Sequence, residues 1–291
     1  MQTVRESIGL RAAVAAWKAQ GLRVALVPTM GALHAGHLAL VAAAKEQAHR
    51  VAVSIFVNPL QFNDPADLDR YPRTEEADAE ALREAGADLL WLPTPDSLYP
   101  EGFATTVHVA GVSDRWEGEH RPGHFDGVAT VVAKLFVAAA PDVALFGEKD
   151  YQQLAVIRRM TSDLGLPVDI VGHATVRDSE GLALSSRNAL LDEAGRAAAP
   201  TLGAALREAG AAILAGERVE AALSAARARL DAAGFGPVDY LAYVDADTLE
   251  PLAERRENGR LIVAAFHGKI RLIDNICVDP DTVDGSWSPR R

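Results

Sequence analysis

Two histidines lie three residues apart in the stretch "PTMGALHAGH" (28–37), which directly follows an apolar run. Its two glycines let the backbone turn sharply, and a helix that starts at 35–37 offers free N–H groups to an anion. His34 and His37 are spaced so that both rings can face one side of that helix start. The stretch therefore predicts a polyphosphate site, in which the imidazoles stabilise charge that builds up on phosphorus during a reaction.

Two other interpretations of the histidine pair stay open from the residues alone. The pair could hold zinc, with further ligands from elsewhere in the fold, such as His108, His120, His124 or Asp150. Alternatively, the two histidines only cap the helix that follows the turn. Because short motifs also match by chance, the stretch needs support from the rest of the chain.

A second cluster, "NPLQFN" (58–63), places three side-chain amides within six residues, although the whole chain has only five Asn and six Gln. Amides offer both a donor and an acceptor, which suits a substrate that carries hydroxyls as well as a carboxylate. An ordinary Asn-Pro turn is the alternative. We favour that turn for Asn63 and a binding role for Gln61.

A third cluster, "GEKD" (147–150), follows the apolar run "DVALF". Gly147 gives a tight exit from a strand, Lys149 supplies a mobile positive charge, and Asp150 can bond a ribose or a metal-bound water. A solvated loop with a surface ion pair is the alternative. Because the chain has five lysines against twenty-four arginines, a lysine at this place carries additional weight.

Two further polar loops are candidates for the same site. In "LSSRN" (184–188), Ser185 or Ser186 could simply cap the following helix, or both could grip phosphates together with Arg187. The loop "EHRPGHFDG" (119–127) precedes a buried helix. It is either a mobile surface loop or a segment that helps to close the site.

Short apolar runs alternate with longer helix-period segments in the first part of the chain, which indicates β-α units and a parallel sheet. Thr74 is expected to cap one of the helices, and Gly86 to end it. The three clusters each follow a strand, and ligands of open α/β sheets bind outside the carboxyl ends of the strands, so we expect the clusters to converge in one pocket. The expected strands are 22–28 (the first), 51–57, 87–93, 103–110, 142–146 and 168–176, and the expected helices 37–50, 74–86, 126–140 and 151–164.

The pattern changes after about residue 178, where helices precede strands. Helices are expected at 192–215 and 217–233, followed by strands at 238–246, 260–267 and 269–276. Gly268 is expected at the turn of a tight hairpin between the last two strands. We therefore predict an α/β protein with a Rossmann-like parallel-sheet domain over 1–178 and a smaller α+β domain over 179–291.

Length, charge and cysteine content exclude several classes of protein. A chain of 291 residues can bury one large core or two modest ones. Its net charge of −11 argues against a nucleic-acid partner, and its apolar segments are too interrupted for a membrane span. Cys277 is the only cysteine, and the first twenty residues lack the apolar core of an export signal, so we predict a cytoplasmic protein.

Six stretches occur in order between about residue 22 and residue 190: "PTMGALHAGH", "FVNPLQF", "YPRT", "HFDGVATVV", "FGEKDYQQL" and "LALSSRN". Together they resemble the pantothenate synthetase (pantoate–β-alanine ligase) family of the HxGH nucleotidyltransferase superfamily, with a weaker match at "RLIDN" near the end. The resemblance implies an ATP-dependent ligase that joins pantoate to β-alanine through a pantoyl adenylate and releases AMP and pyrophosphate. It also implies a C-terminal lid, a homodimer, and Mg²⁺ bound mainly through the ATP phosphates rather than by protein side chains.

The resemblance assigns roles to individual residues. His37, His34 and Lys149 are the expected catalytic residues. Pantoate and β-alanine are expected at Gln61 and Gln153, with Asn58, Tyr71 and Arg121 bordering them. The stretch 281–291 matches no part of the family pattern and receives no role. The ATP-binding residues implied are Met30, Gly31, Ala32, Leu33, His34, Ala35, Gly36, His37, Gly147, Glu148, Lys149, Asp150, Val176, Leu184, Ser185, Ser186 and Arg187.

Two rival functions have distinct signatures. A nucleotidyltransferase of the same fold would pass AMP to a phosphate acceptor and would never release free AMP. A nucleotide-sensing protein would bind ATP without pantoate-dependent pyrophosphate exchange. The amide-rich "NPLQF" and the second domain favour the ligase.

Overall fold

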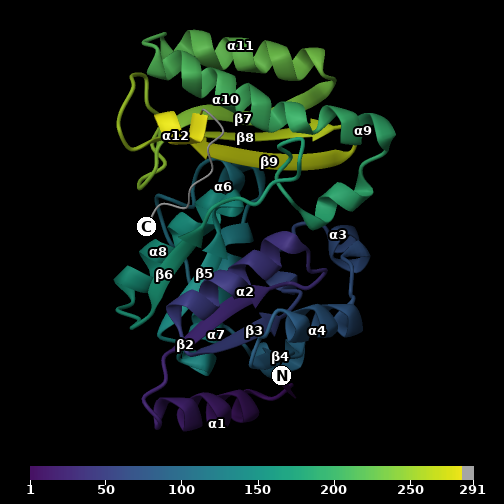
Figure 1. Ribbon diagram of the computed structural model, residues 1–291, viewed down its shortest axis with the longest axis vertical. Helices are drawn as coiled ribbons and strands as arrows, with labels where there is room; N and C mark the ends of the chain where they lie inside the picture. The colour runs from purple at the N-terminus through teal and green to yellow at the C-terminus, as the bar shows by residue number, and fades with distance from the viewer. Residues whose placement is uncertain (284–291) are drawn as a thin grey trace. The chain divides into compact units, whose positions relative to one another are not determined.

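The computed structural model describes residues 1–283 and divides the chain into two compact units (Figure 1). The N-terminal unit consists of Met1–Glu148 and Gln152–His173, and the C-terminal unit of Lys149–Tyr151 and the chain from Ala174 onward. The division differs from the predicted ranges 1–178 and 179–291 at residues 174–178 and at 149–151. Residues 284–291, most of the stretch that received no role, lie outside the described residues.

A six-stranded parallel sheet forms the N-terminal unit, in the order β1-β4-β3-β2-β5-β6. From β2 the chain proceeds through β3 to β4 on one side, and β5 and β6 continue on the other side of β2. The order therefore reverses between β2 and β5, which is the point where Rossmann-like sheets bind ligands. The predicted parallel α/β sheet is confirmed. The strands are β1 (Gln2–Val4), β2 (Val24–Thr29), β3 (Arg50–Ile55), β4 (Leu89–Trp91), β5 (Val143–Gly147) and β6 (Asp169–His173).

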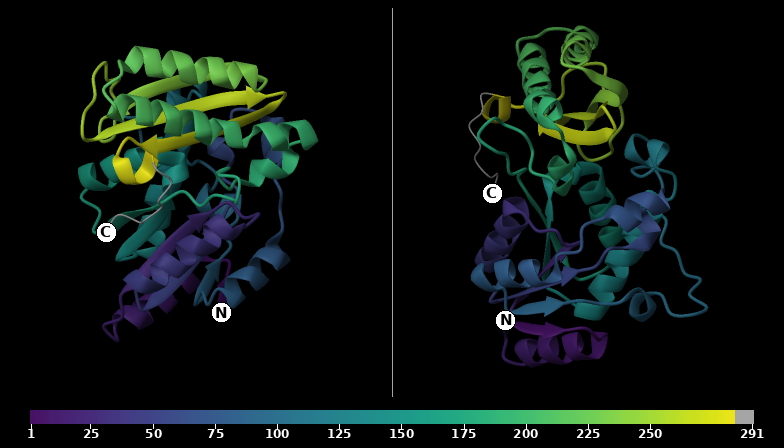
Figure 2. Two further views of the ribbon diagram at one scale, coloured as in Figure 1. Left: turned by 45° about the horizontal axis from the view of Figure 1, so that its top comes forward. Right: turned by 90° about the vertical axis from the view of Figure 1, so that its right-hand side faces the viewer.

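Helices cover both faces of this sheet (Figures 1 and 2). Ala25 and Val27 of β2 pack in one core with residues of α2 and α4, whereas α1 and α7 pack against each other and against β2. Val24 and Leu26 point to the opposite face from Ala25 and Val27 and are equally buried, which explains the continuous apolar run that predicted this strand. The longer helices are α1 (Ser7–Lys18), α2 (Ala35–Gln47), α4 (Glu75–Glu84), α7 (His124–Ala139) and α8 (Tyr151–Asp163); the short ones are α3 (Pro65–Arg70), α5 (Pro95–Leu98) and α6 (Glu117–His120), with 3-10 turns η1 (Pro59–Gln61) and η2 (Glu148–Asp150).

The predicted strand over 103–110 is wrong. Residues 103–110 lie in no helix or strand, and the six-stranded sheet ends at β1 and β6. It is held instead by side chains of α7: the amide of Val107 donates to Oγ1 of Thr130 (2.9 Å), and Nδ1 of His108 lies 2.8 Å from Oδ1 of Asp126. The segment is therefore held by a helix and not by a neighbouring strand.

Two other differences have local causes. Strand β1 precedes the run at 22–28 that was expected to be the first strand, and with three residues it is too short to show periodicity. The helix expected over 192–215 is two helices, α9 (Glu193–Ala198) and α10 (Pro200–Leu214). Pro200 begins the second helix because proline lacks an N–H and is tolerated only in a first turn.

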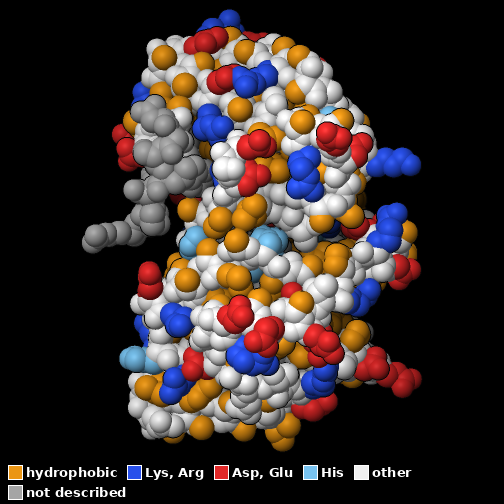
Figure 3. Space-filling model, turned by 45° about the vertical axis from the view of Figure 1, so that its right-hand side comes forward, with side chains coloured by type: hydrophobic (Ala, Val, Ile, Leu, Met, Phe, Trp, Pro, Cys, Tyr) orange, Lys and Arg blue, Asp and Glu red, His pale blue; other side chains and the backbone are white. Residues whose placement is uncertain are grey.

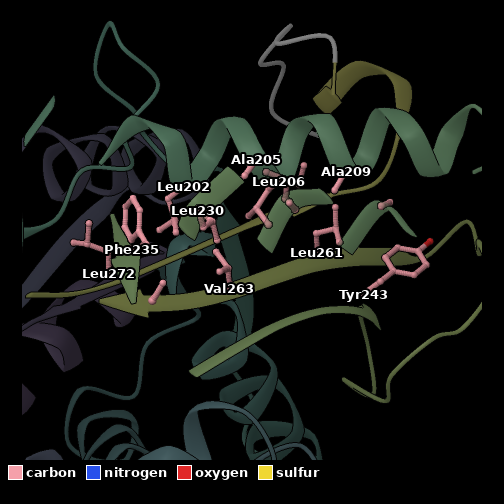
Figure 4. Close-up of a cluster of buried hydrophobic side chains, with 14 of the residues drawn as sticks. Leu202, Ala205, Leu206, Ala209, Leu230, Phe235, Tyr243, Leu261, Val263 and Leu272 are labelled. Carbon is pink, nitrogen blue, oxygen red and sulfur yellow. The ribbon is translucent and has the colours of Figure 1, made fainter. Parts of the chain in front are cut away.

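In the C-terminal unit, α10 and α11 (Val219–Ala232) pack on one face of an antiparallel sheet in the order β7-β8-β9 (Figure 2). Leu202 and Leu206 of α10 meet Leu261 and Val263 of β8 in the core (Figure 4). Gly268, with a φ of 58°, closes the β8-β9 hairpin as predicted. The strands are β7 (Phe235–Asp245), β8 (Gly259–His267) and β9 (Ile270–Cys277), with the short elements η3 (Ser186–Leu190) and α12 (Pro280–Val283).

The described part of the chain contains no helix that is both long and apolar enough to cross a membrane. On the face of the molecule in Figure 3, Lys and Arg side chains are interspersed with Asp and Glu. That face does not present the clustered basic field that nucleic-acid binding usually requires.

Candidate active site

The turn that follows β2 leads directly into α2, and its two histidines cap that helix. Nδ1 of His34 accepts a hydrogen bond from the amide of Gly36 (3.2 Å), and Nδ1 of His37 accepts one from the amide of His34 (3.3 Å). The two ring centroids lie 4.1 Å apart. The rings therefore lie together at the helix start, as the spacing predicted, and the capping interpretation is also correct.

Capping by Nδ1 fixes the tautomer of each ring in its neutral form. An imidazole whose Nδ1 accepts from an N–H carries its proton on Nε2 in the neutral form. In the neutral form His34 and His37 thus both carry their N–H donor at Nε2, in rings that lie at the N-terminal end of α2, where the helix dipole is positive. Two such donors at a helix start suit the oxygens of a phosphate group.

Asp78 of α4 holds this turn in shape and was missed by the sequence reasoning. Its side chain exposes 4% of its surface, and its two oxygens accept from the amides of Ala32 and Leu33, both at 2.9 Å. Thr74 is the N-cap residue of α4, but its hydroxyl donates to Oδ2 of Asp78 (3.1 Å), so the predicted capping bond to the helix backbone is wrong. An acidic residue four positions before the buried Leu82, on the apolar face of the helix, was the available signal.

The turn has no room for larger side chains beside this carboxylate. Gly31 has a φ of 83°, and a Cβ at this position would lie 3.1 Å from Oδ2 of Asp78 and 3.1 Å from Cγ2 of Ile55. Ala32 follows with a φ of 50°, a conformation that is uncommon for a residue with a side chain. Two bonds to one carboxylate stabilise this backbone path.

Asn58, at the start of the second cluster, is a buried positioning residue. It exposes 1% of its surface, and its Nδ2 donates to Oε1 of Gln61 (3.0 Å) and to the carbonyl of Gly127 (3.0 Å). Its Oδ1 accepts from the hydroxyl of Tyr99 (2.8 Å). Burial raises the pKa of Tyr99 well above its usual value, so this phenol stays a hydrogen-bond donor. Asn58 therefore orients Gln61.

Gln61 connects the amide-rich turn to the histidine turn. Its Nε2 donates to Sδ of Met30 (3.0 Å), the residue that begins the histidine turn. Its own carbonyl accepts from Nη2 of Arg121 (3.2 Å) and from Nδ1 of His124 (2.8 Å). The structure thus brings two of the predicted clusters together within the N-terminal unit, and it assigns Arg121 a contact with the backbone of the Gln61 turn.

The adjacent glutamines of α8 differ in what surrounds them. Gln152 exposes 8% of its surface; its Oε1 accepts from the amide of Glu117 (3.0 Å), and its Nε2 donates to the carbonyls of Val112 (2.9 Å) and Arg115 (2.8 Å). The side-chain amide of Gln153 is only partly buried and has no hydrogen-bond partner within residues 1–283. Gln152 therefore holds the 112–117 segment, and Gln153 can offer its amide to a ligand.

Two other polar residues of this region make structural contacts. Tyr71 packs edge-on against Phe62, with ring centroids 5.6 Å apart. Nδ2 of Asn63 donates to the carbonyl of Pro122 (2.7 Å), which agrees with the turn interpretation of Asn63.

The third cluster leaves the sheet at the same edge as the histidine turn. Strands β2 and β5 pair in parallel, with Ala25 opposite Val143, so Gly147 and Glu148 follow a carboxyl end next to that of β2. Residues 149–151 belong to the C-terminal unit. There Nζ of Lys149 lies 3.6 Å from Oδ1 of Asp150, the ion pair that the alternative interpretation expected.

The remaining candidates lie in the C-terminal unit. The amide of Leu184 donates to the carbonyl of Val176 (2.9 Å), so these two residues are neighbours. Oγ of Ser185 accepts from the amide of Arg187 (3.3 Å) and caps η3, which confirms the capping interpretation for this serine. Binding roles for Val176 and for 184–187, and the convergence of all clusters in one pocket, stay predictions.

Fold and site define a class: a Rossmann-like α/β protein with an HxGH turn, whose two histidines cap a helix, at the switch point of its sheet. A family model described as pantoate–β-alanine ligase matches residues 2–277. Pantothenate synthetase of Rhizorhabdus wittichii is 58% identical over 280 residues, covering 96% of this chain and 99% of that protein. That of Rhodospirillum rubrum is 57% identical over 270 residues, covering 92% and 96%.

Solved structures give the same result. Pantothenate synthetase from Thermus thermophilus superposes with a TM-score of 0.90 at 50% identity, covering 96% of this chain and 100% of that one. Pantoate–β-alanine ligase from Francisella tularensis, solved in complex with β-γ ATP and β-alanine, has a TM-score of 0.80 at 32% identity, covering 96% and 98%. The chain belongs to the pantoate–β-alanine ligase family.

Proposed function

We propose that this chain condenses pantoate with β-alanine to form pantothenate, at the expense of ATP, and that it releases AMP and pyrophosphate. The observation that carries the proposal is the histidine turn, where Nδ1 of His34 and Nδ1 of His37 cap the start of α2 at the end of the sheet where Rossmann-like folds bind ligands. The family membership of the chain supports the choice of substrates. So does the related enzyme of Francisella tularensis, which was solved with β-γ ATP and β-alanine.

In the first step, a carboxylate oxygen of pantoate attacks the α-phosphorus of ATP in line, and the bond to pyrophosphate breaks. We assign the stabilisation of the developing charge to His34 and His37, to the ammonium of Lys149 and to Arg187. Gln61, oriented by Asn58, and Gln153 hold pantoate in line for the attack. The products are pantoyl adenylate and pyrophosphate.

In the second step, the amine of β-alanine attacks the acyl carbon of the adenylate, the bond to AMP breaks, and the nitrogen loses a proton. The activated acyl group already carries a good leaving group, so no protein nucleophile is needed. We therefore assign no covalent role to Cys277 or to the serines of 184–187.

The remaining assignments concern positioning. Asn58 and Arg121 act through the Gln61 turn, because both contact it directly, and Tyr71 borders the pantoate region. The residues that we propose to surround the nucleotide are Met30, Gly31, Ala32, Leu33, Ala35, Gly36, Gly147, Glu148, Asp150, Val176, Leu184, Ser185 and Ser186.

Magnesium is expected to enter with the nucleotide. Within residues 1–283, no three His, Cys, Asp or Glu side chains gather as a set of metal ligands. We therefore propose that Mg²⁺ is held mainly by the ATP phosphates, where it neutralises part of their charge. A homodimer and a cytoplasmic location are likewise proposals; light scattering on a sizing column tests the former.

The function is tested by omitting one substrate at a time. The protein is mixed with ATP, MgCl₂, pantoate and β-alanine, and AMP and pyrophosphate are both followed. We expect AMP only in the complete mixture and pantoate-dependent ATP–pyrophosphate exchange without β-alanine. Pyrophosphate without free AMP would indicate a nucleotidyltransferase, and the absence of pantoate-dependent exchange would indicate a nucleotide-binding protein.

A further inference from the structure

The stretch "RLIDN" (271–275) of β9 contributes none of the site residues proposed above, yet its last two polar side chains are buried. Asp274 and Asn275 each expose 4% of their surface. Successive residues of a strand point to opposite faces of the sheet, and Leu272 and Ile276 face the helices in the core. Asp274 therefore lies on the helix side of the sheet and Asn275 on the other side.

Asp274 fixes the segment that leads to 184–187. Its carboxylate forms a two-pronged ion pair with Arg177, at 2.6 Å (Nη1–Oδ2) and 2.7 Å (Nη2–Oδ1). Nη1 of Arg177 also donates to the carbonyl of Gly181 (3.1 Å). A Cβ at Gly203 of α10 would lie 3.0 Å from Oδ2 of Asp274, so the helix packs closely over the pair. The pair thus ties the 177–181 turn to the strand.

Asn275 holds the segment 149–151 in the same unit. Its Nδ2 donates to the carbonyl of Lys149 (2.9 Å), and its Oδ1 accepts from Nη1 of Arg260 on β8. The guanidinium of Arg260 lies 3.6 Å from the centroid of the Tyr151 ring. Asn275, Arg260 and Tyr151 are all buried. The Asn275 amide therefore holds the main chain at Lys149, and the Arg260 guanidinium packs on the side chain of Tyr151, on the other side of Asp150.

We propose that Asn275 and Arg260 are positioning residues for Lys149 in the adenylation step. The inference rests on the proposed function, because it requires the Lys149 ammonium to act on the ATP phosphates. A lysine side chain is long and flexible, so the place of its ammonium depends on how firmly its main chain is held. Strand β9 then holds two parts of the C-terminal unit: Lys149 through Asn275, and the 177–181 turn, which precedes the 184–187 loop, through Asp274.

Two substitutions of Asn275 test the contact to Lys149. Asn275→Ala removes both hydrogen bonds, whereas Asn275→Asp keeps an acceptor for Arg260 and turns an oxygen toward the Lys149 carbonyl. Both should lower kcat/KM for ATP in pantoate-dependent ATP–pyrophosphate exchange by about tenfold or more, because small misplacements of a catalytic group are costly. The KM for pantoate should change by less than about twofold, since Gln61 and Gln153 hold that substrate.

Asp239→Asn is the matched control. Nε of Arg271, in the same stretch, donates to Oδ2 of Asp239 (2.7 Å), so this pair ties β9 to β7. The control should lower the melting temperature of the protein and leave kcat/KM for ATP within about twofold of the wild type. A fall in melting temperature for Asn275→Ala with unchanged kinetics would overturn the proposal, because Asn275 would then be merely structural.

A double-mutant comparison decides whether Asn275 acts through Lys149. If it does, the exchange rate of the double variant Lys149→Ala/Asn275→Ala should be no lower than that of Lys149→Ala alone. If the two substitutions instead lower the rate independently, their effects multiply and the inference is overturned. If the variants exchange too slowly for a rate to be measured, the same variants can be compared by their Kd for a non-hydrolysable ATP analogue, measured by calorimetry. Failure of the proposed function would be seen in other measurements. The wild type would then show no pantoate-dependent exchange, or Lys149→Ala would exchange as fast as the wild type.

Discussion

Replacing Asp78 with asparagine tests whether a buried carboxylate keeps the histidine turn in its reactive shape. Each of its two oxygens accepts one backbone amide, from Ala32 and from Leu33, at 2.9 Å. Asparagine has nearly the same shape but only one oxygen. It can keep one of these bonds, and it must turn its own NH₂ group toward the other amide.

The size of the effect follows from these two bonds. A hydrogen bond to a charged group contributes about 1.5–3 kcal/mol, and a buried donor that loses its partner costs about 1–3 kcal/mol. We expect Asp78→Asn to lower the free energy of unfolding by about 2–4 kcal/mol. Because the turn carries His34, a shift of its backbone should also lower the exchange rate by about 10- to 100-fold, or about 1.4–2.8 kcal/mol.

Asp142→Asn serves as the control for this prediction. Oδ2 of Asp142 accepts from the amide of Val24 (2.7 Å) at the opposite end of β2, and Oδ1 lies 2.9 Å from Nζ of Lys18. Burial favours the neutral form of Asp142, but the Val24 amide and the Lys18 ammonium outweigh it and hold its pKa below the usual value. Asp142→Asn should have a lower free energy of unfolding than the wild type, and its exchange rate should stay within about twofold of the wild-type rate.

The assay combines urea unfolding with initial rates of pantoate-dependent exchange. The reasoning would be refuted if Asp78→Asn lost stability but kept wild-type kinetics. It would also be refuted if the Asp142→Asn control lost as much activity, since the effect would then come from general loosening of β2.

His37→Ala should lose about 2–4 kcal/mol of transition-state stabilisation in exchange, and near-wild-type turnover at saturating substrate would exclude its role. Gln153→Ala should raise the KM for pantoate without lowering the melting temperature; an effect on ATP alone would show that the assignment is wrong. Gln152→Ala should instead lower the free energy of unfolding by about 2–4 kcal/mol, because three backbone groups lose their partner. Ionised Asp142 stabilises the fold above its unfolded-state pKa, and this contribution is lost as the pH falls through its lower folded-state pKa. The free energies of unfolding of the wild type and Asp142→Asn, measured in urea, should therefore converge below about pH 4. A constant difference between them down to about pH 3 would contradict this.

Local pattern was enough to predict most of the elements and the histidine turn. The strand β2 is a continuous apolar run because both of its faces are buried. The glycines and histidines of 31–37 predict a strand-to-helix turn because they act on the backbone within a few residues. The prediction over 103–110 was wrong because this stretch is held by side chains of α7 and not by a neighbouring strand. A short stretch does not reveal by itself which element will hold it.

Adjacent identical residues show the same limit within the site. Gln152 and Gln153 cannot be told apart by type or spacing, yet the side chain of Gln152 bonds three backbone groups, whereas that of Gln153 has no hydrogen-bond partner within residues 1–283. The role of Asp78 likewise depends on a turn some forty-five residues earlier in the chain. Partners so distant in sequence leave no periodic trace.

The sequence by itself determined the order of strands and helices, the tight turn with its paired imidazoles, and the family to which the chain belongs, because these depend on neighbouring residues and on the identity of short stretches. Only the tertiary structure decided which ring nitrogens cap the helix, that Asp78 holds the turn, and that Asn275 holds the main chain of Lys149. Hydrogen-bond partners and burial are properties of residues brought together by folding. They are therefore settled only when strands and helices from distant parts of the chain have packed.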